Sequence, residues 1–230
     1  KAAVKTTNMN GKYVLSDPQT GKYVEKAFAD FNSYPRPTEY FDVYSPKIST
    51  LYSQVYWTRM DKVELPADIV KRFDGKTMAV VGFEVDQVFK GETDVSVPIN
   101  VAYNHHFESE MLGKGASVEK ITLQGPNDPR APKAGAMGHG RPDPNTLYSI
   151  KDNRQTPNDI PNHQAFGAGN GGEYRKSFHG YSPGYAQLID SPQSIYITPM
   201  QIDTWNRDKM NKTDPAGKFV SGPVPRNSLA

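Results

Sequence analysis

Two of the five histidines are adjacent, as His105 and His106 in the stretch YNHHF, and adjacent imidazoles suggest a metal site. Neutral imidazole is the commonest protein nitrogen ligand for copper and zinc. Successive side chains of a regular strand point to opposite faces, so the pair can share an ion only if the strand ends or bulges, or if the rings lie trans in a linear pair. Copper(I) accepts linear or T-shaped coordination, which favours copper over tetrahedral zinc. Alternatively, His105 is a hydrogen-bonded core residue and His106 faces solvent.

Other side chains of the same chemical kind lie elsewhere in the chain. Met137 and His139 in AMGHG, together with His163, are further candidates for metal binding, or ordinary solvated loop residues. Glu108 lies two residues beyond His106 and is predicted to share its face, where it could accept a hydrogen bond and orient the imidazole, or simply face solvent. Tyr103 is predicted to share a face with His105 and is the second candidate for such a supporting role.

The composition narrows the class of protein. The 230 residues are 36% hydrophobic and 11% aromatic, with 19 Gly and 19 Pro, and the mean hydropathy is −0.68. Aromatic and β-branched residues interrupted by Gly and Pro indicate short strands joined by turns. No apolar run is long enough to span a membrane. The net charge is +2 with both signs interspersed, so we expect no nucleic-acid partner.

The absence of cysteine excludes disulfides, thiolate metal sites and cysteine nucleophiles. The first residues contain neither an initiator Met nor a signal-peptide apolar region, so we interpret the chain as mature or trimmed. A secreted protein, or one of an organelle lumen, is the localisation we expect.

Alternating patterns predict the elements that would position these residues. Strands are expected over 53–60, 76–91 and 95–112, with a helical turn over 65–75 that stops at Gly75. KGETD should join the second and third of these strands into an antiparallel hairpin. Strand-like alternation returns over 173–190 and 194–208, where Ile195 and Ile197 face away from Tyr196 and Thr198.

The sequence therefore predicts a mostly β protein, an antiparallel jelly-roll-like β-sandwich with long irregular Pro/Gly-rich loops. We divide the chain into an N-terminal wrapping segment (1–50), a β-sandwich domain (51–208) with a long loop insertion (124–172), and an extended C-terminal tail (209–230). A stretch as poor in core-forming residues as the insertion is functional, disordered, or bound to a partner.

The order of three segments resembles the first domain of the type II, ascorbate-dependent copper monooxygenase family. VYWT (55–58) is similar to its aromatic strand, YNHHFESEML (103–112) to its paired-histidine strand, and GNGGEYRKSFHGY (169–181) to the Gly-Gly loop before a third histidine. The resemblance covers roughly residues 51–190. It implies a copper held by His105, His106 and His179, with Gly171 and Gly172 in the turn before the last strand.

Two features depart from that family. Its first domain carries disulfides, which this chain cannot form, and its catalytic copper uses a His-x-His pair that does not occur after His179. A copper-binding β-sandwich protein for electron transfer or copper holding is therefore our first hypothesis, and hydroxylation is not supported. An oxidoreductase is the only enzyme class suggested.

A different class of function stays open. The Pro/Gly/Asn-rich segments and the Pro-rich tail could lie on a protein partner, which would make the chain a non-catalytic structural or accessory subunit of a larger assembly. Carbohydrate binding by aromatic residues such as Tyr52, Tyr56 and Trp57 is a third possibility that fits sandwich folds generally. Replacing the histidines should abolish the role of a copper protein and spare that of an assembly subunit.

Overall fold

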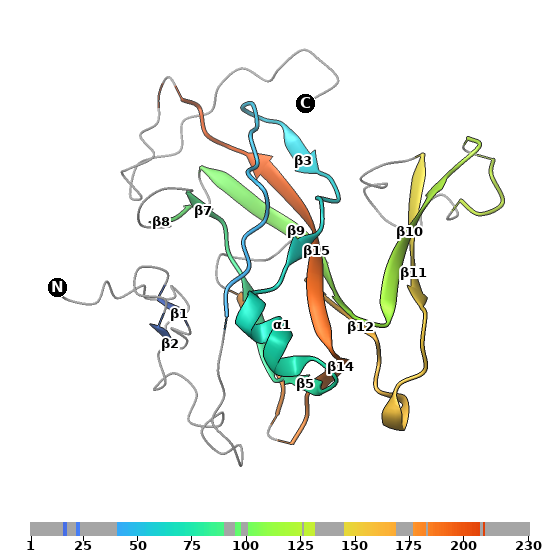
Figure 1. The fold of residues 1–230 in the computed structure, drawn as a ribbon. Helices are drawn as coiled ribbons and strands as arrows, with labels where there is room; N and C mark the ends of the chain where they lie inside the picture. The colour runs from blue at the N-terminus through green and yellow to red at the C-terminus, as the bar shows by residue number, and fades with distance from the viewer. Residues whose placement is uncertain are drawn as a thin grey trace.

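The fold was analysed in a computed structural model (Figure 1). It describes residues 16–17, 22–23, 41–89, 95–97, 101–125, 127–131, 145–168, 177–182, 184–207 and 209. The candidates Met137, His139, Gly171 and Gly172 lie outside these residues, as do most of segment 1–40 and nearly all of the tail.

Strands dominate the described residues, and every pairing between them is antiparallel, which confirms the predicted mostly β class. None of the helices among these residues has the length and apolar character to cross a bilayer. In chain order the elements are β1 (Ser16–Asp17), β2 (Lys22–Tyr23), β3 (Val55–Trp57), β4 (Val63–Glu64), α1 (Ala67–Phe73), β5 (Thr77–Val80), β6 (Gly82–Val85), β7 (Val88–Phe89), β8 (Val95–Ser96), β9 (Ala102–Gly113), β10 (Ala116–Thr122), β11 (Thr146–Asp152), a 3-10 turn (Pro157–Asp159), β12 (His163–Ala168), β13 (Ser177–Gly180), β14 (Gln187–Asp190) and β15 (Pro192–Asp203).

A five-stranded sheet, the main sheet, organises the fold. Its order is β12-β9-β15-β3, with β4 also paired to β15. Strands β9 and β15 are 12 residues long and form its centre. Both were predicted from alternation, and the pairing of Ile197 with Ser109 and of Tyr196 with Glu110 shows Ile197 and Tyr196 on opposite faces as expected.

One face of the main sheet, which we call the core face, carries Phe107 and Met111 and is covered by small elements. Phe83 of β6 packs edge-on against Phe107 and Phe166, with ring centroids 6.3 and 5.0 Å apart. Helix α1 and the β5–β14 pair complete the layer. The buried cluster consists of Leu65, Ile69, Met78, Met111, Phe166 and Ile189.

The opposite face, which we call the ribbon face, carries His106, Glu108 and Glu110. Beside it stands the ribbon, the β10–β11 pair, whose seven residue pairs run in unbroken register (Figure 1). Arg59 joins the two. Its guanidinium binds Glu110 at 2.6 Å and lies 4.5 Å from the Tyr196 ring and 4.7 Å from the Tyr148 ring of β11. The sheets thus form layers consistent with a sandwich, while the jelly-roll connectivity stays a prediction.

Helix α1 forms where the helical turn was predicted. Asp68 lies in its first turn and Lys71 and Arg72 in its last, which complements the helix dipole. Ile69 is buried against the core face. Gly75 has a φ of +68°, a left-handed conformation that glycine adopts without a steric penalty, so the predicted stop at this residue is confirmed.

Two expectations about the strands need correction. Among the residues that the structure describes, the predicted hairpin is present only near its tip, where β7 pairs with β8 over two residue pairs. Beyond the tip, β6 pairs with β13 while β9 pairs with β12 and β15. Pro98 follows β8 closely, and proline has no amide hydrogen to donate to a ladder.

The second correction concerns the predicted loop insertion, because β11 and β12 both lie within 124–172. The Pro, Gly and Asn residues around these two strands led to the prediction of a loop, although Leu147, Tyr148 and Ile150 are strand-forming residues. The strands form because they pair with distant segments, β11 with β10 and β12 with β9.

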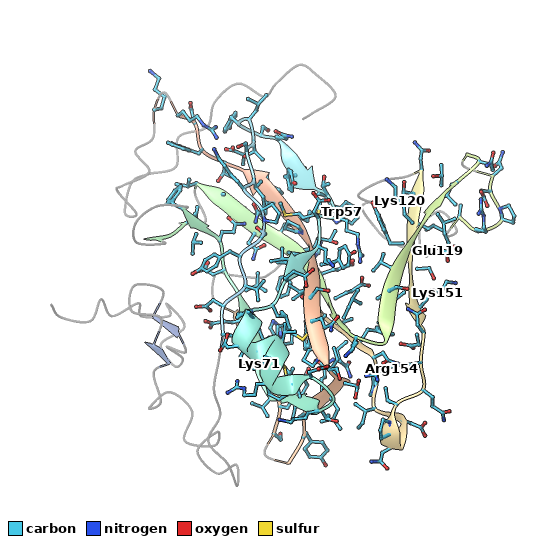
Figure 2. The ribbon with its side chains drawn as sticks, viewed as in Figure 1. Trp57, Lys71, Glu119, Lys120, Lys151 and Arg154 are labelled. Atoms are coloured by element: carbon cyan, nitrogen blue, oxygen red, sulfur yellow. The ribbon has the colours of Figure 1, made fainter. Side chains whose placement is uncertain are left out.

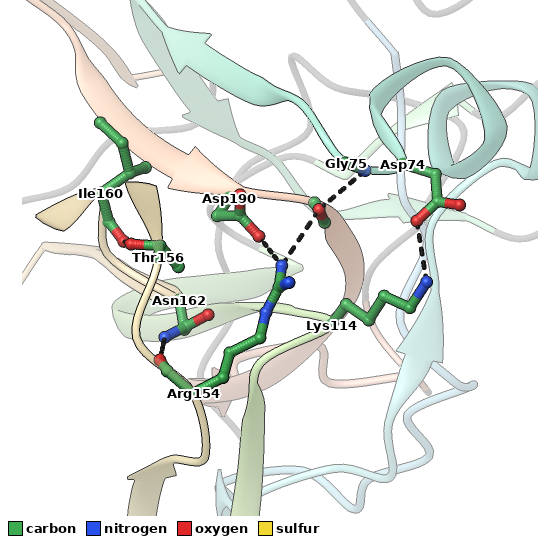
Figure 3. Close-up of polar contacts among 9 residues, drawn as sticks. Asp74, Gly75, Lys114, Arg154, Thr156, Ile160, Asn162 and Asp190 are labelled. Atoms are coloured by element: carbon green, nitrogen blue, oxygen red, sulfur yellow. Dashed lines mark hydrogen bonds and ion pairs between the residues drawn. The ribbon is translucent and has the colours of Figure 1, made fainter. Parts of the chain in front are cut away.

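A polar cluster holds the base of the ribbon to the β14–β15 junction (Figure 3). Arg154, just after β11, contacts the buried Asp190 carboxylate and approaches Ser191 Oγ at 3.4 Å. Its carbonyl accepts a hydrogen bond from Asn162 Nδ2 at 2.7 Å. A Cβ on Gly113 would collide with the Asp190 carbonyl oxygen, so glycine is required for this close approach.

Candidate metal site on a bulged strand

The adjacent histidines lie at an irregularity in β9. Met200 of β15 is opposite His106, and the next residue, Gln201, is opposite Asn104. One residue of β15 therefore corresponds to two of β9, and His105 is the extra residue of a β-bulge. A bulge is one of the three arrangements by which the sequence analysis expected neighbouring imidazoles to share an ion, the others being a strand end and a linear trans pair.

The bulge places the two imidazoles on the same side of the strand. The ring centroids of His105 and His106 are 4.3 Å apart, with an angle of 55° between the planes. His105 also lies 5.0 Å from the ring of Tyr103. Because Tyr103 and His106 pair with Ile202 and Met200, which are two residues apart on β15, both belong to the ribbon face. His105 joins them there.

The spacing of the rings favours one of the two coordination geometries. With metal–nitrogen bonds of about 2.0 Å, trans imidazoles on a linear ion would have centroids about 6 Å apart, and cis imidazoles on a tetrahedral ion about 5 Å apart. The observed 4.3 Å is nearer the cis value. The linear arrangement that favoured copper over zinc therefore does not apply, and the geometry of the pair alone does not choose between the two metals.

His179 lies in a different environment. It pairs with Phe83 across β13 and β6, and the two rings stack with centroids 4.8 Å apart and planes at 11°. Its ring is also 6.4 Å from that of Phe107, on the core face. The main sheet thus separates His179 from His106, and in the described part of the chain no three histidine or carboxylate side chains gather as a metal cluster. The three-histidine set stays a prediction that this geometry does not support.

The residues expected to support the pair behave differently from one another. Tyr103 contacts His105, as described, whereas Glu108 is exposed on the ribbon face opposite Thr198. Glu110, on the same face, is bound by Arg59. His163 is the first residue of β12 and pairs with Leu112, near the C-terminal end of β9. Its Nδ1 is 3.3 Å from the Asp152 carboxylate. It is therefore remote from the pair along the strand.

Sequence reasoning missed one donor. Met200 is directly opposite His106, is 6% exposed, and carries a thioether of the type that binds soft metal ions. The alternation of β15 placed it on the face of Tyr196 and Thr198, but nothing local in the sequence paired it with the histidines.

Comparison with known proteins adds no family, because no family model, curated protein or solved structure matches the chain.

Proposed function

We propose that this chain binds one copper ion through His105 and His106 and serves to hold it or to pass electrons through it. The observation that carries the proposal is the bulge, which brings both imidazoles to one face with centroids 4.3 Å apart. A bulge interrupts the hydrogen-bond ladder between two strands. Bulges are nevertheless over-represented next to active sites, where they re-aim a side chain. Imidazole nitrogens bind copper(II) more strongly than they bind the other divalent first-row metal ions.

The pair is partly withdrawn from solvent. His105 Nδ1 is shielded from solvent, and His106 is partly buried. The resemblance to the first domain of the copper monooxygenases supports the same metal, since it rests on the same YNHHF stretch.

The test is copper binding to the metal-free protein at neutral pH, with elemental analysis and X-ray absorption of the reduced form. We expect one copper per chain with at least two nitrogen neighbours. His106→Ala should lower the copper affinity at least tenfold, because it removes one of the two nitrogen ligands.

His163→Ala is the matched control, since it removes another partly exposed histidine of the main sheet and should leave the affinity unchanged. Failure of the wild-type protein to take up copper, or equal affinities for the wild type and His106→Ala, would reject the proposal.

A further inference from the structure

A row of three residues crosses the ribbon face at the bulge. Met200 of β15 is directly opposite His106 of β9 on one side and Trp57 of β3 on the other. Directly opposed residues of antiparallel strands share a face, with Cβ atoms about 4.5–5.5 Å apart. The thioether of Met200 thus lies between the imidazole pair and the indole.

The bulge brings three potential metal donors to one place on the sheet. Because His105 and His106 together oppose the single residue Met200, two imidazoles and one thioether lie on the same face of two neighbouring strands. In the described residues, the main buried cluster lies on the core face and includes Met111 but not Met200. Met200 is equally buried, but it lies on the ribbon face and outside that cluster.

The sulfur determines which metal the site prefers. Thioethers are soft ligands that select copper(I), whereas carboxylates, carbonyls and water suit harder ions. A site with two imidazoles and a thioether therefore distinguishes copper(I) from zinc(II) more strongly than two imidazoles alone.

Trp57 supplies an optical reporter at the end of the row. It is partly buried, on the side of the main sheet nearer the ribbon (Figure 2). Because Met200 lies between Trp57 and His106, an ion held by His106 and Met200 would be within about 10 Å of the indole.

We infer that Met200 is the third ligand of the site and makes it selective for copper(I). This inference rests on the proposed function, because it names a ligand and a metal preference of that same site.

The experiment is an anaerobic competition titration of the metal-free protein with copper(I) against a chromophoric copper(I) chelator, and a separate titration with zinc(II). The wild type, Met200→Leu, Met111→Leu and His179→Ala are compared. Met200→Leu should lower the copper(I) affinity at least tenfold and change the zinc(II) affinity less than about twofold.

The other two variants are controls. Met111→Leu removes an equally buried thioether from the core face, and both it and His179→Ala should bind copper(I) as the wild type does. Exchange of Leu for Met usually costs less than about 1.5 kcal/mol, so Met200→Leu should fold. Near-ultraviolet circular dichroism of the metal-free variant checks this.

A measurement without any variant at position 200 keeps the inference testable. In protein labelled with selenomethionine, selenium-edge absorption should show a copper neighbour after copper(I) addition. Trp57 and Trp205 are the only tryptophans, so in Trp205→Phe copper(I) should quench the indole emission and zinc(II) should not.

The outcomes separate the two proposals. Copper uptake with nitrogen neighbours only, and an unchanged affinity in Met200→Leu, would overturn this inference and leave the proposed function standing. A tenfold loss in His179→Ala with no loss in Met200→Leu would overturn it in favour of the three-histidine set. Absence of any copper from the wild type would end both.

Discussion

The conformation of a single residue, His105, determines what the adjacent histidines can do. In an uninterrupted strand its ring would lie on the core face with Phe107, but the bulge turns it to the ribbon face beside His106. The chemistry of the pair thus depends on the register between β9 and β15. A sequence shows residue types but not register, so it could pose the question and not answer it.

A second residue, Asp128, makes a turn whose stability depends on pH. Its carboxylate accepts hydrogen bonds from the backbone amides of Gln124 and Arg130, both at 2.9 Å, and from the Arg130 guanidinium at 2.6 Å. The Arg130 side chain is the main reason that the pKa of Asp128 lies below its ordinary value of 3.8. The charged form is therefore preferred in the folded turn.

The sign of the pH effect follows from this lowered pKa. The turn's contribution to stability should be complete above about pH 5 and should be lost as the pH falls below 3.8 through the lower pKa of the folded state. An NMR titration of the Asp128 carboxyl carbon, with amide exchange at Arg130, would show it. Asp128→Asn should remove the pH dependence, and a carboxyl titrating at or above 3.8 would contradict the prediction.

At the scale of elements, the ribbon is held to the rest of the fold by the Arg154 cluster at its base and by Arg59. An isolated two-stranded hairpin is at best marginally stable in water. The ribbon gains support from Arg59, which is sandwiched between Tyr148 and Tyr196 and bound to Glu110. The planar guanidinium is essential for this arrangement, because an ammonium group cannot stack in the same way.

We therefore expect Arg59→Lys to loosen the ribbon while the main sheet stays intact. A loss of about 1.4 kcal/mol, within reach of two cation–π contacts, would lower amide-exchange protection in β10 and β11 about tenfold. Hydrogen exchange followed by mass spectrometry measures both regions in one sample.

Lys151→Ala is the matched control for Arg59→Lys. Its ammonium group is exposed and 3.3 Å from Glu119, and exposed pairs contribute little (Figure 2). Equal protection in Arg59→Lys and the wild type would show that the polar cluster at Arg154 suffices to hold the ribbon.

The elements also show what the sequence could predict. The alternation in β9 and β15 and the stop of α1 at Gly75 are local patterns, and these predictions are confirmed. The sandwiching of Arg59, the bulge at His105 and the donor Met200 all arise from pairing between distant segments. The proposed ligand Met200 and its neighbour Trp57 are brought beside His106 only by the strand order β9-β15-β3.

At the scale of the whole molecule, the two layers meet at Phe107. This side chain is 1% exposed and contacts Phe83 of the layer over the core face. The predicted role in a larger assembly stays a prediction, because most of the Pro/Gly-rich segments and the tail lie outside the described residues. The expected secretion or lumenal location likewise stays a prediction.

Removing the Phe107 ring should destabilise the entire fold. Phe107→Ala is expected to lower the free energy of unfolding by about 3–5 kcal/mol, because the buried ring leaves a cavity between the layers. Urea unfolding followed by circular dichroism measures this change. Tyr185→Ala, which alters a side chain that is 71% exposed, should change it by less than about 0.5 kcal/mol, and a similarly small effect at Phe107 would refute the layered core.

The bulge at His105 has a consequence for how such a site is inherited. Without this one residue, Asn104 and His106 would face Gln201 and Met200 in an unbroken ladder, and neither flank of β9 would shift. Deletion of the His105 codon would then leave the main sheet folded and remove the histidine pair. Insertion of a histidine codon at the same place would create the pair. Under the proposed function, a protein built in this way can acquire or abandon its metal in one genetic step, without passing through an unfolded ancestor.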